Sequence, residues 1–178
     1  MELELHAHRW TRRSPDWAAA AVAGFAAGAI LMVIELAWAA TLSDAGTWRI
    51  PQLVAALVLG PGSLQVPGGS FSIPVVALAL AIHYALGIAF GLVLGYVISG
   101  FHWETSIPVM QLFGIGVGAL LYFFNFHVLT QLTPWFAELR GWPTFLAHLV
   151  FGVSTALLYW RLARRGMNPG RRRAGLKG

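Results

Sequence analysis

The sequence predicts an all-α, polytopic membrane protein built as a four-helix transmembrane bundle. Of the 178 residues, 57% are hydrophobic and only 11% are charged, whereas soluble domains average about 25% charged residues. Four apolar segments each reach the roughly 20 residues that a helix needs to cross a bilayer. This composition excludes a soluble enzyme, and a chain with no cysteine has neither disulfides nor thiolate metal sites.

The four predicted spans cover residues 17–42, 74–98, 108–130 and 143–163. Proline stands near the start of the last three spans, where a missing N–H costs a helix least. Tryptophans lie near several span ends, as is typical of membrane–water interfaces. The connection between the second and third spans is short, so these two helices are expected to be antiparallel neighbours.

The connection over residues 43–73 is long and contains the apolar stretch "IPQLVAALVLGPG", which is too short to span. It predicts an interfacial or re-entrant segment, or a cap folded on the outer face. Ten of the twelve Lys and Arg residues lie in residues 9–13 and 161–177, and residues 164–178 form a basic tail. The positive-inside rule therefore predicts that both termini are cytoplasmic. These basic ends indicate topology and lipid contact rather than nucleic-acid binding.

An internal repeat is indicated by two pairs of similar segments. "GFAAGAILMVIEL" matches "GIGVGALLYFFNF", which aligns Glu35 with Asn125, and "AIHYALGIAFGLVL" matches "LAHLVFGVSTALLY", which aligns His83 with His148. Both hairpins start on the same side, so the pattern predicts two similar helical hairpins related by a parallel pseudo-twofold axis. Small residues at four-residue spacing favour close helix packing within the chain, with contact in a homo-oligomer as the alternative.

Each predicted span carries one ionisable side chain at a similar depth. Glu35, His83, His127 and His148 all fall about 5 to 14 Å inside the outer, periplasmic ends of their helices. Such groups cost several kcal/mol in a membrane unless they are paired, so they mark a candidate functional site. Asn125 lies at the same level as a supporting polar group. It is two residues from His127, so the two side chains are not expected to face the same way.

Four interpretations of this site are open. A glutamate with three histidines is a reasonable set of ligands for a transition metal in a helical bundle. Alternatively, His83 and His148 are the axial ligands of a haem b, with Arg49 and Arg140 at the rim pairing with its propionates. In a third interpretation, the glutamate and a histidine form a proton relay or part of a substrate pathway. In the fourth, the polar groups only bond one another and fix helix register.

The order of "HYALGIAFG", "GALLYFFNFHVLTQLTPWF" and "AHLVFGVSTALLY" along the last three spans resembles that of the YagU-like small bacterial inner-membrane proteins. The resemblance implies a four-span protein in the bacterial inner membrane and implies no reaction. The sequence thus favours a non-enzymatic integral membrane protein, such as an accessory subunit of a larger membrane complex, whose His/Glu site binds a metal ion or haem. The alternative is a small transporter or proton pathway that uses the same polar cluster.

Overall fold

The computed structural model describes residues 14–65, 70–101 and 106–166, and within these ranges the regular structure is entirely helical. Its four long helices are α1 (Trp17–Leu42), α3 (Ile73–Phe101), α4 (Ile107–Phe123) and α5 (Trp142–Gly166). Further helical turns prolong α4 to residue 131, and all four segments are long and apolar enough to cross a membrane. The chain is therefore a multi-pass membrane protein, as its composition predicts.

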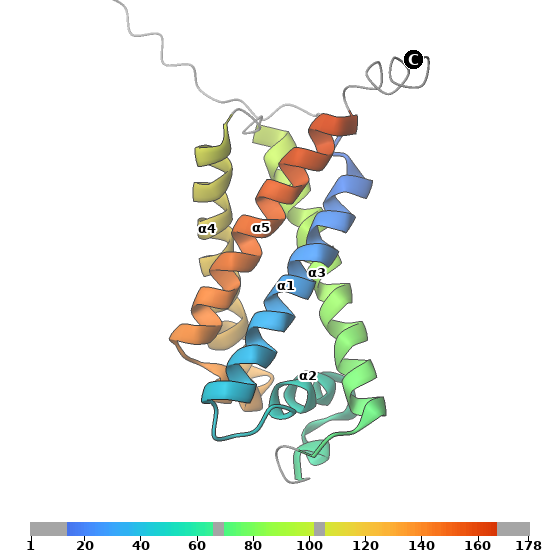
Figure 1. The fold of residues 1–178 in the computed structure, drawn as a ribbon, viewed down its shortest axis with the longest axis vertical. Coiled ribbons are helices and arrows are strands. Elements are labelled where there is room, and N and C mark those ends of the chain that lie inside the picture. The colour runs from blue at the N-terminus through green and yellow to red at the C-terminus, as the bar shows by residue number, and fades with distance from the viewer. Residues whose placement is uncertain (1–13, 66–69, 102–105, 167–178) are drawn as a thin grey trace, which may run out of the picture.

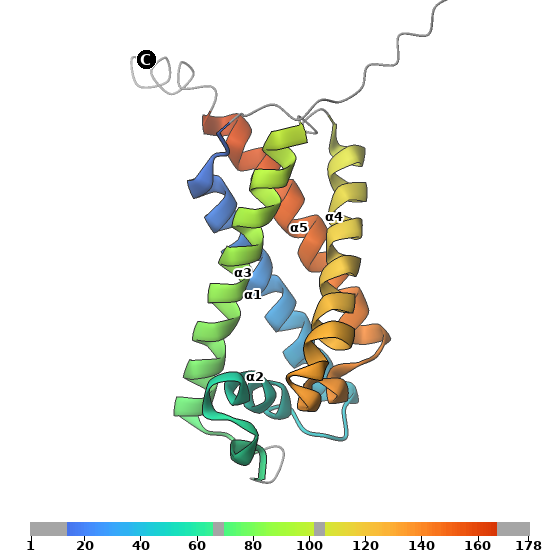
Figure 2. The ribbon, with the colours of Figure 1, turned by 180° about the vertical axis from the view of Figure 1, so that it is seen from behind.

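Two of the four long helices, α1 and α5, pack together as the central pair of the bundle (Figure 1). The outer helix α3 packs on α1, and the outer helix α4 packs on α5. Seen from behind, α3 and α4 stand apart in front of the central pair (Figure 2). Among the described residues these two helices run antiparallel, as expected, but they hardly touch. Each packs against its own central helix instead, because the small residues that allow close approach lie there.

Glycines set the closest helix approaches in both hairpins. A Cβ atom added to Gly24 of α1 would overlap the Gly87 carbonyl of α3, and one added to Gly152 of α5 would overlap the Gly114 carbonyl of α4. These four glycines correspond pairwise in the repeat that the sequence predicts. The internal repeat and its pseudo-twofold axis stay a prediction, because similar packing of small residues does not require them.

The long connection after α1 forms a cap. Its helix α2 (Arg49–Leu59) lies across the end of the bundle opposite to the start of α1 and the end of α5 (Figure 1), and it is followed by the short turn η1 (Pro61–Gln65). One face of α2 is buried and includes Leu53 and Ala56, while Val58 and Leu59 are exposed. The apolar stretch in this connection therefore closes one end of the bundle, and it leaves two apolar side chains exposed at its own end.

The end of α4 changes its helical geometry at the level of the predicted polar site. A π-helical turn, η2 (Phe124–Val128), follows α4, and the 3-10 turns η3 (Leu129–Gln131) and η4 (Pro134–Leu139) lead to α5. A π-turn holds one residue more than an α-turn and is often found at functional sites. The exposed side chain of His127 and the half-buried Asn125 lie on different sides of this turn.

Candidate functional site

A cavity of about 110 Å³ lies between α3 and α4, near the α2 end of the bundle. Residues of α1 and α5 form its floor, and residues of α2 and η4 close it toward the end of the bundle. An apolar cavity of about 150 Å³ is large enough to bind benzene. The cavity therefore has the size for a small molecule of a few heavy atoms.

Four polar side chains from four segments line this otherwise apolar cavity: Glu35, His83, Asn125 and His148. They come from α1, α3, η2 and α5, and the sequence singled out all four. His127 does not line the cavity, because its side chain is exposed and rests beside the rings of Tyr122 and Phe123. The cavity thus brings together one polar group from each long helical segment.

Glu35 lies at a junction between two cavities. It lines the main cavity and also a smaller one of about 40 Å³ between α1, α2 and α3, and His83 lines both as well. No hydrogen bond or ion pair joins the Glu35 carboxyl to any residue that the structure describes. An unpaired carboxyl at membrane depth is costly, so this position points to a role in binding or in proton movement.

The hydrogen bond of His83 fixes its tautomer. Its Nε2 atom lies 2.8 Å from the carbonyl oxygen of Gly28 on α1. A carbonyl oxygen only accepts hydrogen bonds, so Nε2 carries the proton and donates. In the neutral ring, the other nitrogen, Nδ1, is therefore an acceptor.

The hydrogen bonds of His148 fix the opposite tautomer. Its Nδ1 donates to the Thr144 carbonyl oxygen, one turn back along α5, at 2.8 Å. Its Nε2 therefore accepts, and the Asn125 side-chain nitrogen lies 3.4 Å from it. The ring is buried and meets the rings of Tyr122 and Phe126 edge-on. The Asn125 amide points its nitrogen at this ring, which leaves its carbonyl oxygen as an acceptor.

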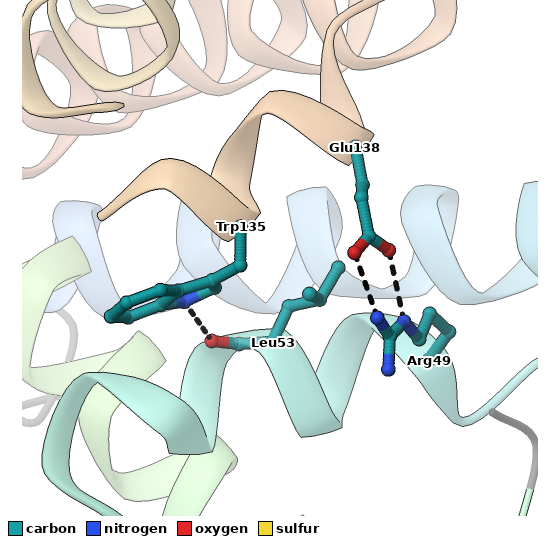
Figure 3. Close-up of polar contacts among 4 residues, drawn as sticks. All are labelled: Arg49, Leu53, Trp135 and Glu138. Carbon is teal, nitrogen blue, oxygen red and sulfur yellow. Dashed lines mark hydrogen bonds and ion pairs between the residues drawn. The ribbon is translucent and has the colours of Figure 1, made fainter. Parts of the chain in front are cut away.

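The two arginines predicted at the rim bond to groups of the protein. Arg49, the first residue of α2, donates from Nε and Nη2 to the two carboxylate oxygens of Glu138 in η4, at 2.9 and 2.7 Å (Figure 3). These hydrogen bonds raise the pKa of the Arg49 guanidinium above its usual value. Arg140 donates to the Phe126 carbonyl oxygen at 2.5 Å and to the Thr130 hydroxyl at 2.8 Å.

A second contact joins the cap to η4. The indole nitrogen of Trp135 donates to the carbonyl oxygen of Leu53, at 3.1 Å, beside the Arg49–Glu138 pair (Figure 3). Leu53 is fully buried. Sequence reasoning missed Trp135 and Glu138, since their partners on α2 lie more than 80 residues away. Two polar contacts thus hold α2 in place over the cavity.

The geometry does not favour the predicted metal or haem centre. Within the part of the chain that the structure describes, no three His, Asp or Glu side chains lie where they could hold a metal ion. His127, one of the four proposed ligands, is outside the cavity. For haem, the acceptor nitrogen of His148 already meets Asn125, and a cavity of about 110 Å³ is far smaller than a porphyrin requires.

Comparisons of the chain with protein-family models, with curated proteins and with solved structures found no match. The resemblance to the YagU-like proteins therefore stays a prediction.

Proposed function

We propose that this chain is a non-enzymatic integral membrane protein that binds a small, largely apolar molecule in the cavity between α3 and α4. One observation carries the proposal: four polar side chains from four separate segments converge on one cavity whose other walls are apolar. Ligand sites typically combine apolar walls with a few polar groups that fix orientation. Polar groups that only set helix register need no cavity between them.

The cavity lies in one half of the bundle, near α2. The opposite end carries Arg161 and Arg164, and the Arg164 guanidinium lies 4.3 Å from the centre of the Trp160 ring. A basic residue stacked on tryptophan suits a membrane–water interface. The positive-inside rule therefore supports a cytoplasmic location for this end and a periplasmic location for α2. Much of the predicted basic tail lies outside the described residues.

A transport function is the second candidate, because Glu35 and His83 line both cavities. These two residues separate the main cavity from the smaller one between α1, α2 and α3, at a place where a pathway for a proton or a substrate could cross. In vesicles reconstituted with the full chain, transport predicts a flux that the substitution Glu35→Gln removes. A flux that is unchanged by this substitution would argue against a pathway through Glu35.

The binding function is tested with small probes and a variant that fills the cavity. Val54 of α2 lines both cavities, so Val54→Phe adds an aromatic ring to the space. Leu112→Phe is the matched control, because Leu112 lies on the outer face of α4 with 72% of its surface exposed. Binding of n-butylamine, 1-butanol and butyrate to the full chain in lipid nanodiscs is measured by saturation-transfer NMR.

We expect at least one of these probes to bind the wild type and Leu112→Phe, and not to bind Val54→Phe. The proposal fails if no probe binds, or if each probe binds Val54→Phe as tightly as it binds the wild type. The comparison between variants separates binding in the cavity from partition into lipid, because partition is the same for all three.

A further inference from the structure

We infer that the ligand of this cavity is a small primary amine in its ammonium form, with a short apolar body. The inference rests on the proposed function, and it names the chemical class that the polar groups select.

With Glu35 ionised, the polar groups that line the cavity offer more hydrogen-bond acceptors than donors. The Nε2–H of the His83 ring donates to the Gly28 carbonyl oxygen, which leaves Nδ1 as an acceptor. The Nδ1–H of His148 donates to the Thr144 carbonyl oxygen, and the other ring nitrogen of His148, Nε2, contacts the Asn125 amide nitrogen. The remaining groups are thus His83 Nδ1, Asn125 Oδ1 and the Glu35 carboxylate, and each of these accepts.

The carboxyl group of Glu35 has no cationic partner within the described part of the chain. The two arginines nearest the cavity are already engaged: Arg49 pairs with Glu138, and Arg140 bonds to the Phe126 carbonyl oxygen and the Thr130 hydroxyl. The titratable groups that line the cavity beside Glu35 are His83 of α3 and His148 of α5. An isolated carboxylate in apolar surroundings is costly, and a cationic ligand would supply the partner that the ionised form of Glu35 lacks.

The ammonium group matches this set of acceptors in number and in kind. It has three hydrogen-bond donors and no acceptor, and hydrogen bonds between charged partners are about twice as strong as neutral ones. A ligand with a carboxylate, by contrast, would bring a second acid group beside Glu35, and a hydroxyl would bring no positive charge to pair with the ionised form of Glu35.

The walls of the cavity favour a short organic body over a hydrated ion. Four phenylalanine rings line it, those of Phe90, Phe126, Phe136 and Phe151. Aromatic faces attract cations that lie within about 6 Å of the ring centre, and they pack against a hydrocarbon chain. The volume of about 110 Å³ matches a chain of a few carbon atoms.

The test compares n-butylamine with 1-butanol on the full chain in nanodiscs, for the wild type and for Glu35→Gln. Glutamine keeps the size of the side chain and removes its charge. We expect n-butylamine to bind Glu35→Gln about tenfold more weakly or worse, because a charged hydrogen bond is lost, while 1-butanol changes little. His127→Gln is the matched control: it alters a polar residue outside the cavity and should leave both affinities unchanged.

A second measurement needs no variant. Tetramethylammonium carries the same charge as the amine but has no N–H donor, so it should not displace n-butylamine from the wild type. Equal affinity of n-butylamine for the wild type and Glu35→Gln would overturn the inference, as would displacement by tetramethylammonium. If 1-butanol or butyrate is instead the probe that Val54→Phe excludes, the binding function stands and the amine assignment fails. If no probe binds, both fail.

Discussion

Gly24 provides the sharpest test of how the helices are packed. A Cβ atom at this position would overlap the Gly87 carbonyl oxygen and would lie 2.9 Å from the Gly91 Cα atom. Carbon atoms in contact are usually about 3.5 to 4.0 Å apart, so Gly24→Ala requires α1 and α3 to separate by at least about 0.6 Å at their crossing. The partners are backbone atoms of α3, which no side-chain rotation can move away.

We expect Gly24→Ala to destabilise the protein by about 1 to 3 kcal/mol, the usual cost of overpacking a core. Gly116→Ala is the matched control on α4, because a Cβ there meets no atom within 4 Å. In a helix, alanine is more stable than glycine by about 0.5 to 1 kcal/mol, so the control should equal or exceed the wild type in stability. The assay is reversible unfolding of each purified variant in mixed micelles, followed by circular dichroism.

Equal stability of Gly24→Ala and Gly116→Ala would contradict this prediction. Such a result would mean that α1 and α3 are not in backbone contact at this crossing. The hydrogen bond from His83 to the Gly28 carbonyl oxygen, one turn further along α1, would then lose its structural basis.

Three further predictions concern the cap and the buried histidine. A double-mutant cycle on Arg49 and Glu138 should give a coupling of less than about 1 kcal/mol, because the Glu138 side chain is 47% exposed; a larger coupling would contradict its exposure. Trp135→Phe should cost about 0.5 to 1.5 kcal/mol and speed hydrogen exchange in α2, because the Leu53 carbonyl loses the indole donor and keeps only its helical one; unchanged exchange would contradict that bond. The ¹⁵N NMR spectrum of His148 should show a protonated Nδ1 and a bare Nε2, and the reverse pattern would contradict the bond to Thr144.

The long helices and the polar residues of the site could be predicted from the sequence because both depend on local signals. Hydropathy locates α1, α3, α4 and α5, and a polar residue in an apolar run stands out without any knowledge of the fold. The separate directions of Asn125 and His127 also follow from their two-residue spacing. The hydrogen bond between His148 and Thr144 could also have been predicted, since residues four apart share a helix face.

The partners of these residues could not be predicted because they depend on which helix faces meet. All four helices are apolar around most of their circumference, so hydropathy does not show that α3 packs on α1 while standing apart from α4. The π-turn around Asn125 has no sequence signal that we recognise. The contacts of α2 with Glu138 and Trp135 join residues more than 80 positions apart, so the pairing of Arg49 with a protein carboxylate was missed.

Labelling of single cysteines shows whether polar groups from both hairpins share one cavity. The chain has no native cysteine, so Glu35→Cys and Asn125→Cys each present one thiol to methyl methanethiosulfonate. If the two positions share the cavity, adding Val54→Phe slows the labelling of both. The labelling rate of Val33→Cys should stay unchanged, because Val33 lies on the outer face of α1 and is 62% exposed. If Val54→Phe protects one of the two cysteines and not the other, the shared cavity is contradicted.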